Sequence, residues 1–357
     1  MGNIYSLVMA GGQGTRFWPE STSKKPKQYL PLVTKQSLLA DTLDRLDGLV
    51  SHEQRYIVTV KEQKKLVHEE AASKMGEGQV VFEPSGRNTA PCILLSLATL
   101  LKNGAKDSDV VVILPSDHVI LNKNGFQQTI QSAVKVATDK KRIITIGIPP
   151  HFPHTGFGYI QTGAELTENS LDVVSFKEKP NLETAVSYLE SGKYLWNAGM
   201  FVSEIGLLLE EFKEHSPEIF SYYDELYEAI GDEKKEAEVY AKLPSESIDY
   251  AIMEKTSRIG LCKANFDWND LGSWDALSTV VEETEGNTLV SAKNHYFEDA
   301  KGNVVYTPDQ FVGLIGVDDL IVIANGKSVV VLPKSDSQKV KHIVNHLKEK
   351  DYGKELL

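Results

Sequence analysis

A glycine-rich segment close to the start of the chain limits what the chain can fold into and what it can bind. The apolar residues 4–10 predict a buried strand, and Gly11, Gly12 and Gly14 follow it directly. Because glycine has no Cβ atom, the backbone can turn tightly there and come close to a ligand. Backbone N–H groups at the end of a strand can also surround an anion. The segment therefore predicts a loop that binds phosphate groups.

Two familiar glycine loops do not fit this segment. The P-loop requires Gly-Lys followed by Ser or Thr, which is absent here, and the dinucleotide fingerprint requires a glycine where Phe17 stands. Pro19 lies too close to Gly14 for a long helix to begin there, so a helix N-terminus is not expected to bind the anion. A phosphate-binding loop and a glycine turn beside a solvated basic loop both remain open.

The distribution of charge favours a small anionic ligand. The chain has 50 Asp and Glu against 38 Lys and Arg, a formal net charge of −12, which argues against nucleic acid as a partner. Residues 11–28 nevertheless hold four Lys or Arg and one Glu, so this short segment carries a net charge of +3. We therefore expect a polyanionic substrate held at one place.

The cysteines and the apolar segments bear on the location of the protein. Cys92 and Cys262 provide neither a disulfide framework nor a zinc-binding spacing, and both are expected as small buried residues. No apolar stretch approaches the ~20 residues that span a bilayer, and no signal peptide opens the chain. We expect a cytoplasmic protein without a membrane partner.

Predicted strands and helices alternate through the first 150 residues. The strands are expected at 4–10, 55–60, 79–83, 109–114 and 142–148, and helices at 38–49, before 75, at 90–102 and at 126–138. This alternation predicts an α/β fold, a Rossmann-like and mostly parallel sheet with helices on both faces. Ligands bind such sheets at the carboxyl ends of the strands, where the glycine loop and Asp117 should meet. Residues 149–158 are expected as a loop over the pocket.

The pattern of predicted elements changes near residue 285. Short strands are expected at 288–292, 304–307, 311–316, 320–324 and 328–332, with a hairpin at Asn325-Gly326 and a final helix using Val340 to Leu347. So few strands bury little core alone. We expect residues 1–285 to form the large domain, and residues 286–357 to form a small β module that packs on it or on another subunit.

Several segments together resemble sugar-1-phosphate nucleotidylyltransferases, and within them the mannose-1-phosphate guanylyltransferase family. Gly-Gly-x-Gly-Thr-Arg is followed by Pro19 and Pro-Lys-Gln, and further matches run in order to Trp274. They read Pro-Ser-Asp-His at 115–118, Glu-Lys-Pro at 178–180, Trp-Asn-Ala-Gly-Met-Phe at 196–201 and Trp-Asn-Asp-Leu-Gly-Ser-Trp at 268–274. The resemblance implies a catalytic domain over 1–285. It also implies a short left-handed β-helix over 286–357 that contributes to the contact of a homodimer.

The substrates that the resemblance implies, a nucleoside triphosphate and a sugar 1-phosphate, are both highly anionic and require positive charge. Arg16 can grip phosphates with two hydrogen bonds, and Lys27 can act as a point charge near the α-phosphate. Both are predicted catalytic residues. Lys24 and Lys25 are expected on the solvated rim. The nucleotide is expected against Gly11, Gly12, Gly14 and Thr15.

Magnesium commonly accompanies nucleotide phosphates and is held by one or two carboxylates. Asp117, which follows a predicted buried strand, and Asp270, in a turn bounded by Gly and Trp, are the candidates. An Asp at a strand end can equally cap a turn, but the resemblance implies that both bind Mg²⁺ and that Asp117 also contacts the nucleotide. Asp267 competes with Asp270, and His118 is expected in a structural role.

The sugar phosphate is expected to bind within residues 156–201. Glu178 can accept hydrogen bonds from sugar hydroxyls, Lys179 can hold the phosphate, and Gly158 and Asn197 can offer a close backbone and an amide. Alone, Lys-Glu-Lys-Pro would be a solvated charged turn, and it is the resemblance that implies the binding role.

Base recognition is the least constrained step. Guanine carries N1–H and 2-amino donors that a carboxylate or carbonyl can accept, and the resemblance implies Glu83 and Asn88 as the residues that contact the base. No physical feature of the sequence separates guanine from uracil or thymine. Asp249 and Glu254 lie in a further family-like segment, and the sequence assigns them no role.

The resemblance implies transfer of GMP from GTP to α-D-mannose 1-phosphate, which gives GDP-mannose and pyrophosphate. A phosphate monoester has a second pKa near ~6, so the attacking sugar phosphate needs no general base. The alternatives are the same transfer onto fucose, heptose or glucose 1-phosphate, and a non-catalytic nucleotide-sugar sensor. A sensor can lose its phosphate and metal ligands, whereas Arg16, Lys27, Asp117 and Asp270 are all present.

Overall fold

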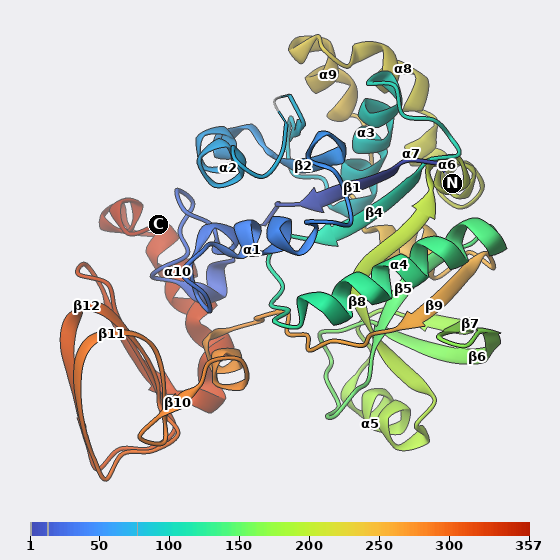
Figure 1. Cartoon of the computed structure of the whole chain (residues 1–357). Coiled ribbons are helices and arrows are strands. Elements are labelled where there is room, and N and C mark those ends of the chain that lie inside the picture. The colour runs from blue at the N-terminus through green and yellow to red at the C-terminus, as the bar shows by residue number, and fades with distance from the viewer. Residues whose placement is uncertain (1, 13, 77) are drawn as a thin grey trace.

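The computed structural model describes residues 2–12, 14–76 and 78–357, and it shows a large α/β domain with a smaller β module at one end (Figure 1). Within these residues the large domain has a nine-stranded sheet with the order β3-β2-β1-β4-β8-β5-β9-β7-β6. Its strands are β1 (Ile4–Met9), β2 (Arg55–Val60), β3 (Val80–Glu83), β4 (Val110–Pro115), β5 (Ile143–Ile148), β6 (Tyr159–Thr167), β7 (Ser170–Lys177), β8 (Tyr194–Glu204) and β9 (Ile259–Lys263).

The sheet is parallel in its first half and mixed in its second. Strands β1 to β4 pair in parallel, and so does β5 with β9. Strand β8 runs antiparallel between β4 and β5, and β6 and β7 form an antiparallel hairpin at the far edge. The predicted α/β class is confirmed, whereas parallel pairing is limited to these two groups of strands.

Helices cover both faces of the sheet, as predicted. One hydrophobic cluster joins the sheet to α3 (Thr89–Lys102), α6 (Ile205–His215) and α8 (Tyr223–Ala229). Another cluster joins the opposite face to α1 (Leu38–Arg45), α2 (Lys64–Ala71) and α4 (Lys123–Lys140). The remaining helices of this domain are α5 (Leu182–Ser191), α7 (Pro217–Phe220) and α9 (Glu233–Tyr240). Adjacent residues of β1 serve opposite faces, since Leu7 belongs to the first cluster and Val8 to the second.

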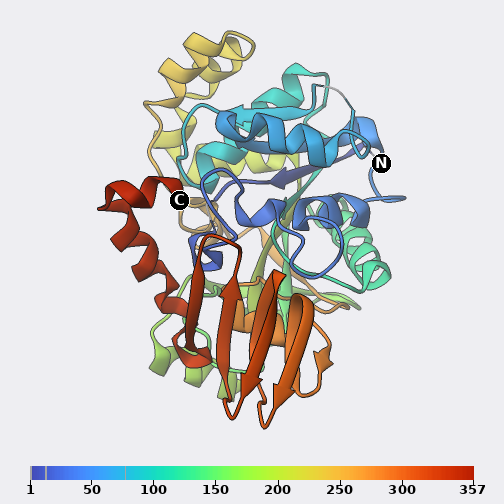
Figure 2. The same cartoon turned by 90° about the vertical axis from the view of Figure 1, so that its left-hand side faces the viewer.

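The C-terminal module is a coil of β-strands followed by a helix (Figure 2). Its elements are β10 (Glu283–Thr284), β11 (Asn287–Glu298), β12 (Val304–Ile315), β13 (Leu320–Ala324), β14 (Val329–Pro333) and α10 (Val340–Lys348). Strands β11, β12 and β13 follow one another closely in the chain and yet pair in parallel, so the chain winds around after each strand. The predicted hairpin is confirmed, because β13 and β14 are antiparallel and Asn325 donates to the carbonyl of Ser328.

The module packs directly on the large domain. A hydrophobic cluster combines Phe17, Trp18 and Trp274 of the large domain with residues of β12, β13 and α10. The Trp18 indole donates to the carbonyl of Leu356 at 3.0 Å, so the end of the chain lies beside the glycine-rich segment. In the described part of the chain, no helix combines the length and apolar character required to cross a membrane.

Candidate active site

A cavity of about 490 Å³ opens at the carboxyl ends of the parallel strands. It extends from the loop after β1 and the ends of β3 and β4 to β8 and the loop before β6. The predicted site residues that line it are Gly11, Gly12, Glu83, Asn88, Asp117, Gly158, Glu178, Asn197 and Asp270. Segments that are far apart in the sequence therefore share one cavity. The expected loop over the pocket also lines it, through Gly156 and Phe157.

Lys27 joins the two acidic segments at one end of the cavity. Its ammonium nitrogen lies 3.0 Å from Oδ2 of Asp117 and 2.7 Å from the backbone oxygen of Asp270. The residue is only 5% exposed, and it is held behind the residues that line the cavity. Gly14 explains how the chain brings it there, because a Cβ atom on Gly14 would lie 2.3 Å from Cβ of Lys27. Glycine is therefore required for this close packing.

Arg16 lies at the rim of the same region. It is exposed, follows Thr15 in a short 3-10 turn, and donates from Nη1 to the carbonyl of Gly272 at 3.3 Å. Gly272 is two residues beyond Asp270, so Arg16 and Lys27 contact the same loop. Neither Thr15 nor Arg16 lines the cavity, and a phosphate group would have to reach outward to meet Arg16.

The surroundings of Asp117 favour its charged form. Burial acts to raise the pKa of this carboxyl, but the ammonium of Lys27 and the nearby His118 bring the pKa below its usual value. The ring of His118 accepts a hydrogen bond at Nδ1 from the Trp268 indole at 3.1 Å, and burial lowers the pKa of this histidine. His118 is held by this hydrogen bond and also lines the cavity, so its structural role stays a prediction.

The carboxylate of Asp267 accepts hydrogen bonds from the backbone outside the cavity. Its Oδ2 accepts from the backbone N–H of Leu121 and its Oδ1 from that of Asn122, both at 2.7 Å. These bonds fix the chain just before α4, and Asp267 does not line the cavity. Of the two competing carboxylates in this segment, Asp270 is therefore the one that faces the cavity.

Glu178 lines the cavity, although its side chain is buried. Its Oε1 forms an ion pair with Lys179, whereas its Oε2 is buried without a hydrogen-bond partner in the described structure. A Cβ atom on Gly158 would lie 2.5 Å from Oε2, so only glycine leaves room for this oxygen. Glu254 accepts from the backbone N–H of Glu178 at 2.9 Å and holds the turn in place. Lys179 itself does not line the cavity.

Asn197 and Asp249 form the floor beside Glu178. The Asn197 amide donates to Oδ1 of Asp249 at 3.0 Å, and its oxygen accepts from Thr145 and from the backbone N–H of Gly199. Burial and the neighbouring Glu178 raise the pKa of Asp249 to about 7. Asp249 begins a π-helical turn, Asp249–Met253, an element found frequently at functional sites. Sequence reasoning noted Asp249 without a role, because only the fold brings it to Asn197.

Glu83 and Asn88 also line the cavity and already have protein partners. Oε2 of Glu83 accepts from the Tyr240 hydroxyl at 2.6 Å, and burial raises the pKa of this carboxyl. Asn88 caps α3, because its side-chain oxygen accepts from the N–H of Thr89 at 2.9 Å. Sequence reasoning missed Tyr240, because its place in a charged helix gave no sign of a contact with Glu83. It also expected Cys92 only as a buried residue, and Cys92 is buried but lines the cavity.

Comparison with known proteins identifies the family. The model of the nucleotidyl transferase family matches residues 5–287, most of the chain. The chain belongs to the nucleotidyl transferase family. A second family model, described as a mannose-phosphate isomerase/GMP-like beta-helix domain, matches residues 293–347. The β module of this nucleotidyl transferase is thus of a known type. The two matched ranges do not test the domain boundary at residue 285, which stays a prediction.

Individual relatives agree with this family. A putative mannose-1-phosphate guanylyltransferase of Vibrio cholerae is 36% identical over 355 residues, which cover 96% of this chain and 74% of the relative. The mannose-1-phosphate guanylyltransferase of Escherichia coli K12 is 34% identical, with 97% of this chain and 73% of the relative covered. A crystal structure from Thermus thermophilus, named mannose-1-phosphate geranyltransferase, is 33% identical with a TM-score of 0.89 and covers 97% of this chain and 99% of its own. The resemblance found in the motifs is confirmed.

Proposed function

We propose that this nucleotidyl transferase transfers GMP from GTP to α-D-mannose 1-phosphate, giving GDP-mannose and pyrophosphate. The observation that carries the proposal is the buried Lys27, whose ammonium joins Asp117 to the Asp270 loop at one end of the cavity. The names of the relatives supply the sugar and the nucleotide. The unpartnered Oε2 of Glu178 at the other end supplies an acceptor for a sugar hydroxyl.

Catalysis in this arrangement is positioning and charge neutralisation. An oxygen of the sugar phosphate attacks the α-phosphorus of GTP, and the bond from that phosphorus to the bridging oxygen of the β-phosphate breaks in line with it. The electron pair leaves with pyrophosphate. Lys27 offsets charge near the α-phosphate, Arg16 grips the outer phosphates at the rim, and the backbone of Gly11 and Gly12 approaches them closely. The nucleophile is already ionised near neutral pH, so no side chain has to remove a proton.

A magnesium ion fits the acidic residues of this cavity. Mg²⁺ prefers carboxylate oxygens together with phosphate and water oxygens, and both Asp117 and Asp270 line the cavity. Lys27 contacts Oδ2 of Asp117, so Oδ1 would be the oxygen of this carboxylate that holds the ion. Asp117 and Asp270 would hold the metal, which would neutralise charge on the phosphate oxygens when bound.

Different residues of the cavity would contact the two substrates. Glu178 and Asn197, with the close backbone of Gly158, would contact the mannose hydroxyls, and Lys179 would hold the sugar phosphate. Glu83 and Asn88 would face the guanine, with Tyr240 fixing the Glu83 carboxylate. Other sugar 1-phosphates or a sensor function are the alternatives, and no contact in the cavity favours either of them.

A turnover assay tests this function. Pyrophosphate release is measured with GTP and mannose 1-phosphate, with and without Mg²⁺, against UTP, dTTP, and fucose and glucose 1-phosphates. We expect the GTP and mannose 1-phosphate pair to give the highest kcat/KM and to require Mg²⁺. Lys27→Met should lose activity, whereas Lys24→Met, at an exposed position nearby, should keep it. Nucleotide-sugar binding without pyrophosphate release would indicate a sensor, and a faster reaction with another sugar would replace mannose in the proposal.

We also propose that the protein is a homodimer in contact through the β module. On β12, residues 311–315 pair with β11, whereas β13 pairs only with 304–306, so the far half of β12 offers an edge. Exposed Tyr296, Phe311 and Ile315 lie along this part of the module. Phe311→Asp should shift the mass measured by light scattering from two chains to one. A mass of one chain for the unaltered protein would contradict the proposal.

A cytoplasmic location without a nucleic-acid or membrane partner completes the proposal. Cys92 and Cys262 are free and buried, a state that suits a reducing compartment. The formal charge of −12 argues against binding to nucleic acid.

A further inference from the structure

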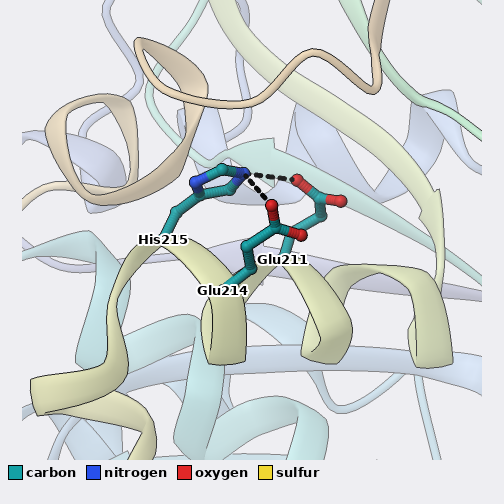
Figure 3. Close-up of side chains that lie close together, drawn as sticks. All are labelled: Glu211, Glu214 and His215. Atoms are coloured by element: carbon teal, nitrogen blue, oxygen red, sulfur yellow. Dashed lines mark ion pairs between the residues drawn. The ribbon is translucent and has the colours of Figure 1, made fainter.

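The C-terminal end of α6 carries a cluster that lies outside the cavity described above. Glu211, Glu214 and His215 have the spacing i, i+3 and i+4, which places them on one side of the helix. Figure 3 shows their two carboxylates and the imidazole pointing toward one another. One ligand atom from each residue lies within 4.8 Å of the others. This is the arrangement in which one ion could contact all three side chains.

Glu211 gives the cluster its unusual character. Its side chain is 1% exposed, and among the residues that the structure describes none donates a hydrogen bond to either carboxylate oxygen. Oε1 faces Nη1 of Arg258 at 3.4 Å, but that nitrogen lies closer, at 2.8 Å, to the neighbouring Glu210. Oε2 points into the cluster and faces Nε2 of His215 at 3.3 Å. A buried carboxylate is costly without a strong partner, so Oε2 is an oxygen prepared for a cation.

The separations fit a small tetrahedral ion. With metal–ligand bonds of about 2.0–2.2 Å, the ligand atoms of a tetrahedral zinc site lie about 3.3–3.6 Å apart. The distance from His215 Nε2 to Glu211 Oε2 is 3.3 Å, and that from Nε2 to Glu214 Oε1 is 4.0 Å. Glu214 is 69% exposed, so its carboxylate is free to close the remaining gap. The carboxyl end of a helix also attracts positive charge.

We propose that Glu211, Glu214 and His215 bind a divalent transition-metal ion of the Zn²⁺ class. Oε2 of Glu211, Oε1 of Glu214 and Nε2 of His215 are the protein ligands, and water completes the tetrahedron. The two carboxylates balance the charge of the ion, and Arg258 remains an outer partner of Glu211. The imidazole binds the ion through its neutral ring nitrogen. A mixed nitrogen and oxygen ligand set separates this site from the all-oxygen pair Asp117 and Asp270, which suits Mg²⁺.

Calorimetric titration of the chelator-treated full-length protein with Zn²⁺ tests the proposal. Excess Mg²⁺ is present so that it occupies the all-oxygen site in the cavity. We expect one Zn²⁺ ion per chain at this site and a weakening of at least ~10-fold in His215→Ala, because even outer partners of a metal are worth that much. Glu214→Gln should weaken binding as well. Glu211 is left intact, since its buried charge also faces Arg258.

Two controls make the result decisive. Glu218→Gln alters an exposed carboxylate just beyond the cluster and should leave Zn²⁺ affinity unchanged. Co²⁺ should give the strong visible absorption of a tetrahedral site in the unaltered protein and in Asp270→Asn, but not in His215→Ala. Zn²⁺ binding that survives His215→Ala and disappears in Asp270→Asn overturns the proposal, as does the absence of binding in the unaltered protein. Neither outcome depends on which sugar or nucleotide the cavity accepts.

Discussion

Replacement of Lys27 by methionine tests the electrostatic basis of the site, because methionine keeps the apolar stem and removes only the ammonium. The ammonium contacts Asp117 at 3.0 Å and the Asp270 carbonyl at 2.7 Å. Loss of one preorganised charge that stabilises a transition state costs about 3–4 kcal/mol, or about 10²–10³ in rate. We expect kcat/KM to fall by that factor.

The effect on stability should be smaller than the effect on catalysis. Removal of one partner of a fully buried ion pair costs about 3–5 kcal/mol. The Asp117 side chain is 36% exposed, however, so water takes over part of the lost contact. We expect the free energy of unfolding to fall by about 1–3 kcal/mol. The depressed pKa of Asp117 contributes stability at neutral pH that is lost as the pH falls through this pKa. The variant should therefore lose less stability on acidification than the unaltered protein.

The assay combines pyrophosphate release at saturating Mg²⁺ with unfolding in urea. Lys27→Arg keeps the charge, but its planar guanidinium cannot reproduce both contacts of the compact ammonium, so its rate should lie between those of the unaltered protein and Lys27→Met. If folded Lys27→Met turned over within about fivefold of the unaltered protein, well under the loss expected for a transition-state charge, Lys27 would have no part in catalysis.

Four further substitutions separate substrate binding, folding, metal binding and ionisation. Gly158→Ala places a Cβ atom 2.5 Å from Oε2 of Glu178, so the KM for the sugar phosphate should rise at least ~10-fold while that for GTP stays the same; equal changes in both would contradict the assigned subsite. Asp267→Asn weakens one of the two exposed hydrogen bonds that Asp267 accepts from the N–H groups of Leu121 and Asn122 and should cost about 0.5–1.5 kcal/mol of stability with kcat retained, whereas Asp270→Asn should abolish Mg²⁺-dependent turnover; a loss of turnover in folded Asp267→Asn would revive Asp267 as the metal ligand. Asp249 has a pKa of about 7 when folded against 3.8 as its ordinary value, so the folded state binds the extra proton and stability falls as the pH rises between these values. Asp249→Asn should lack this decline when both proteins are unfolded in urea at pH 4, 5.5 and 7. If the free energy of unfolding fell equally with pH in the variant and the unaltered protein, the assignment would be wrong.

The parallel first half of the sheet could be predicted from the sequence, whereas β6 and the antiparallel direction of β8 in the second half could not. Residues 55–60 read as a buried strand and form β2 with the same bounds, because all but the last of them are buried. Strand β6 was not predicted, since only Tyr159 and Ile160 of its nine residues are buried and the rest is polar. The antiparallel direction of β8 left no trace in its composition. A pattern of burial reports which faces are covered, not the direction in which a strand runs.

In the β module, the structure has one bent strand where the sequence predicted two. The sequence predicted separate strands at 304–307 and 311–316 because Pro308 and Asp309 read as a turn. The structure has one strand, β12, across both segments, and its partner β11 contains shifts in register near Leu289 and Ala292. These irregularities allow the paired strands to bend together. The coil of strands could thus be inferred from the resemblance, but not from turn residues alone.

The site itself depends on contacts that no local pattern encodes. Lys27 meets Asp117 across 90 residues and the Asp270 loop across 243. The rule that strand ends share one edge predicted that the glycine loop and Asp117 would meet, and only the resemblance placed Lys27 and Asp270 in the same cleft. The structure adds the reason that the two loops stay together: the Trp274 indole donates to the carbonyl of Trp18, and the Trp18 indole donates to that of Leu356. Because these tryptophans lie in the segments that carry Lys27 and Asp270, the C-terminal module supports both sides of the contact between Lys27 and the Asp270 loop, which we propose to be catalytic.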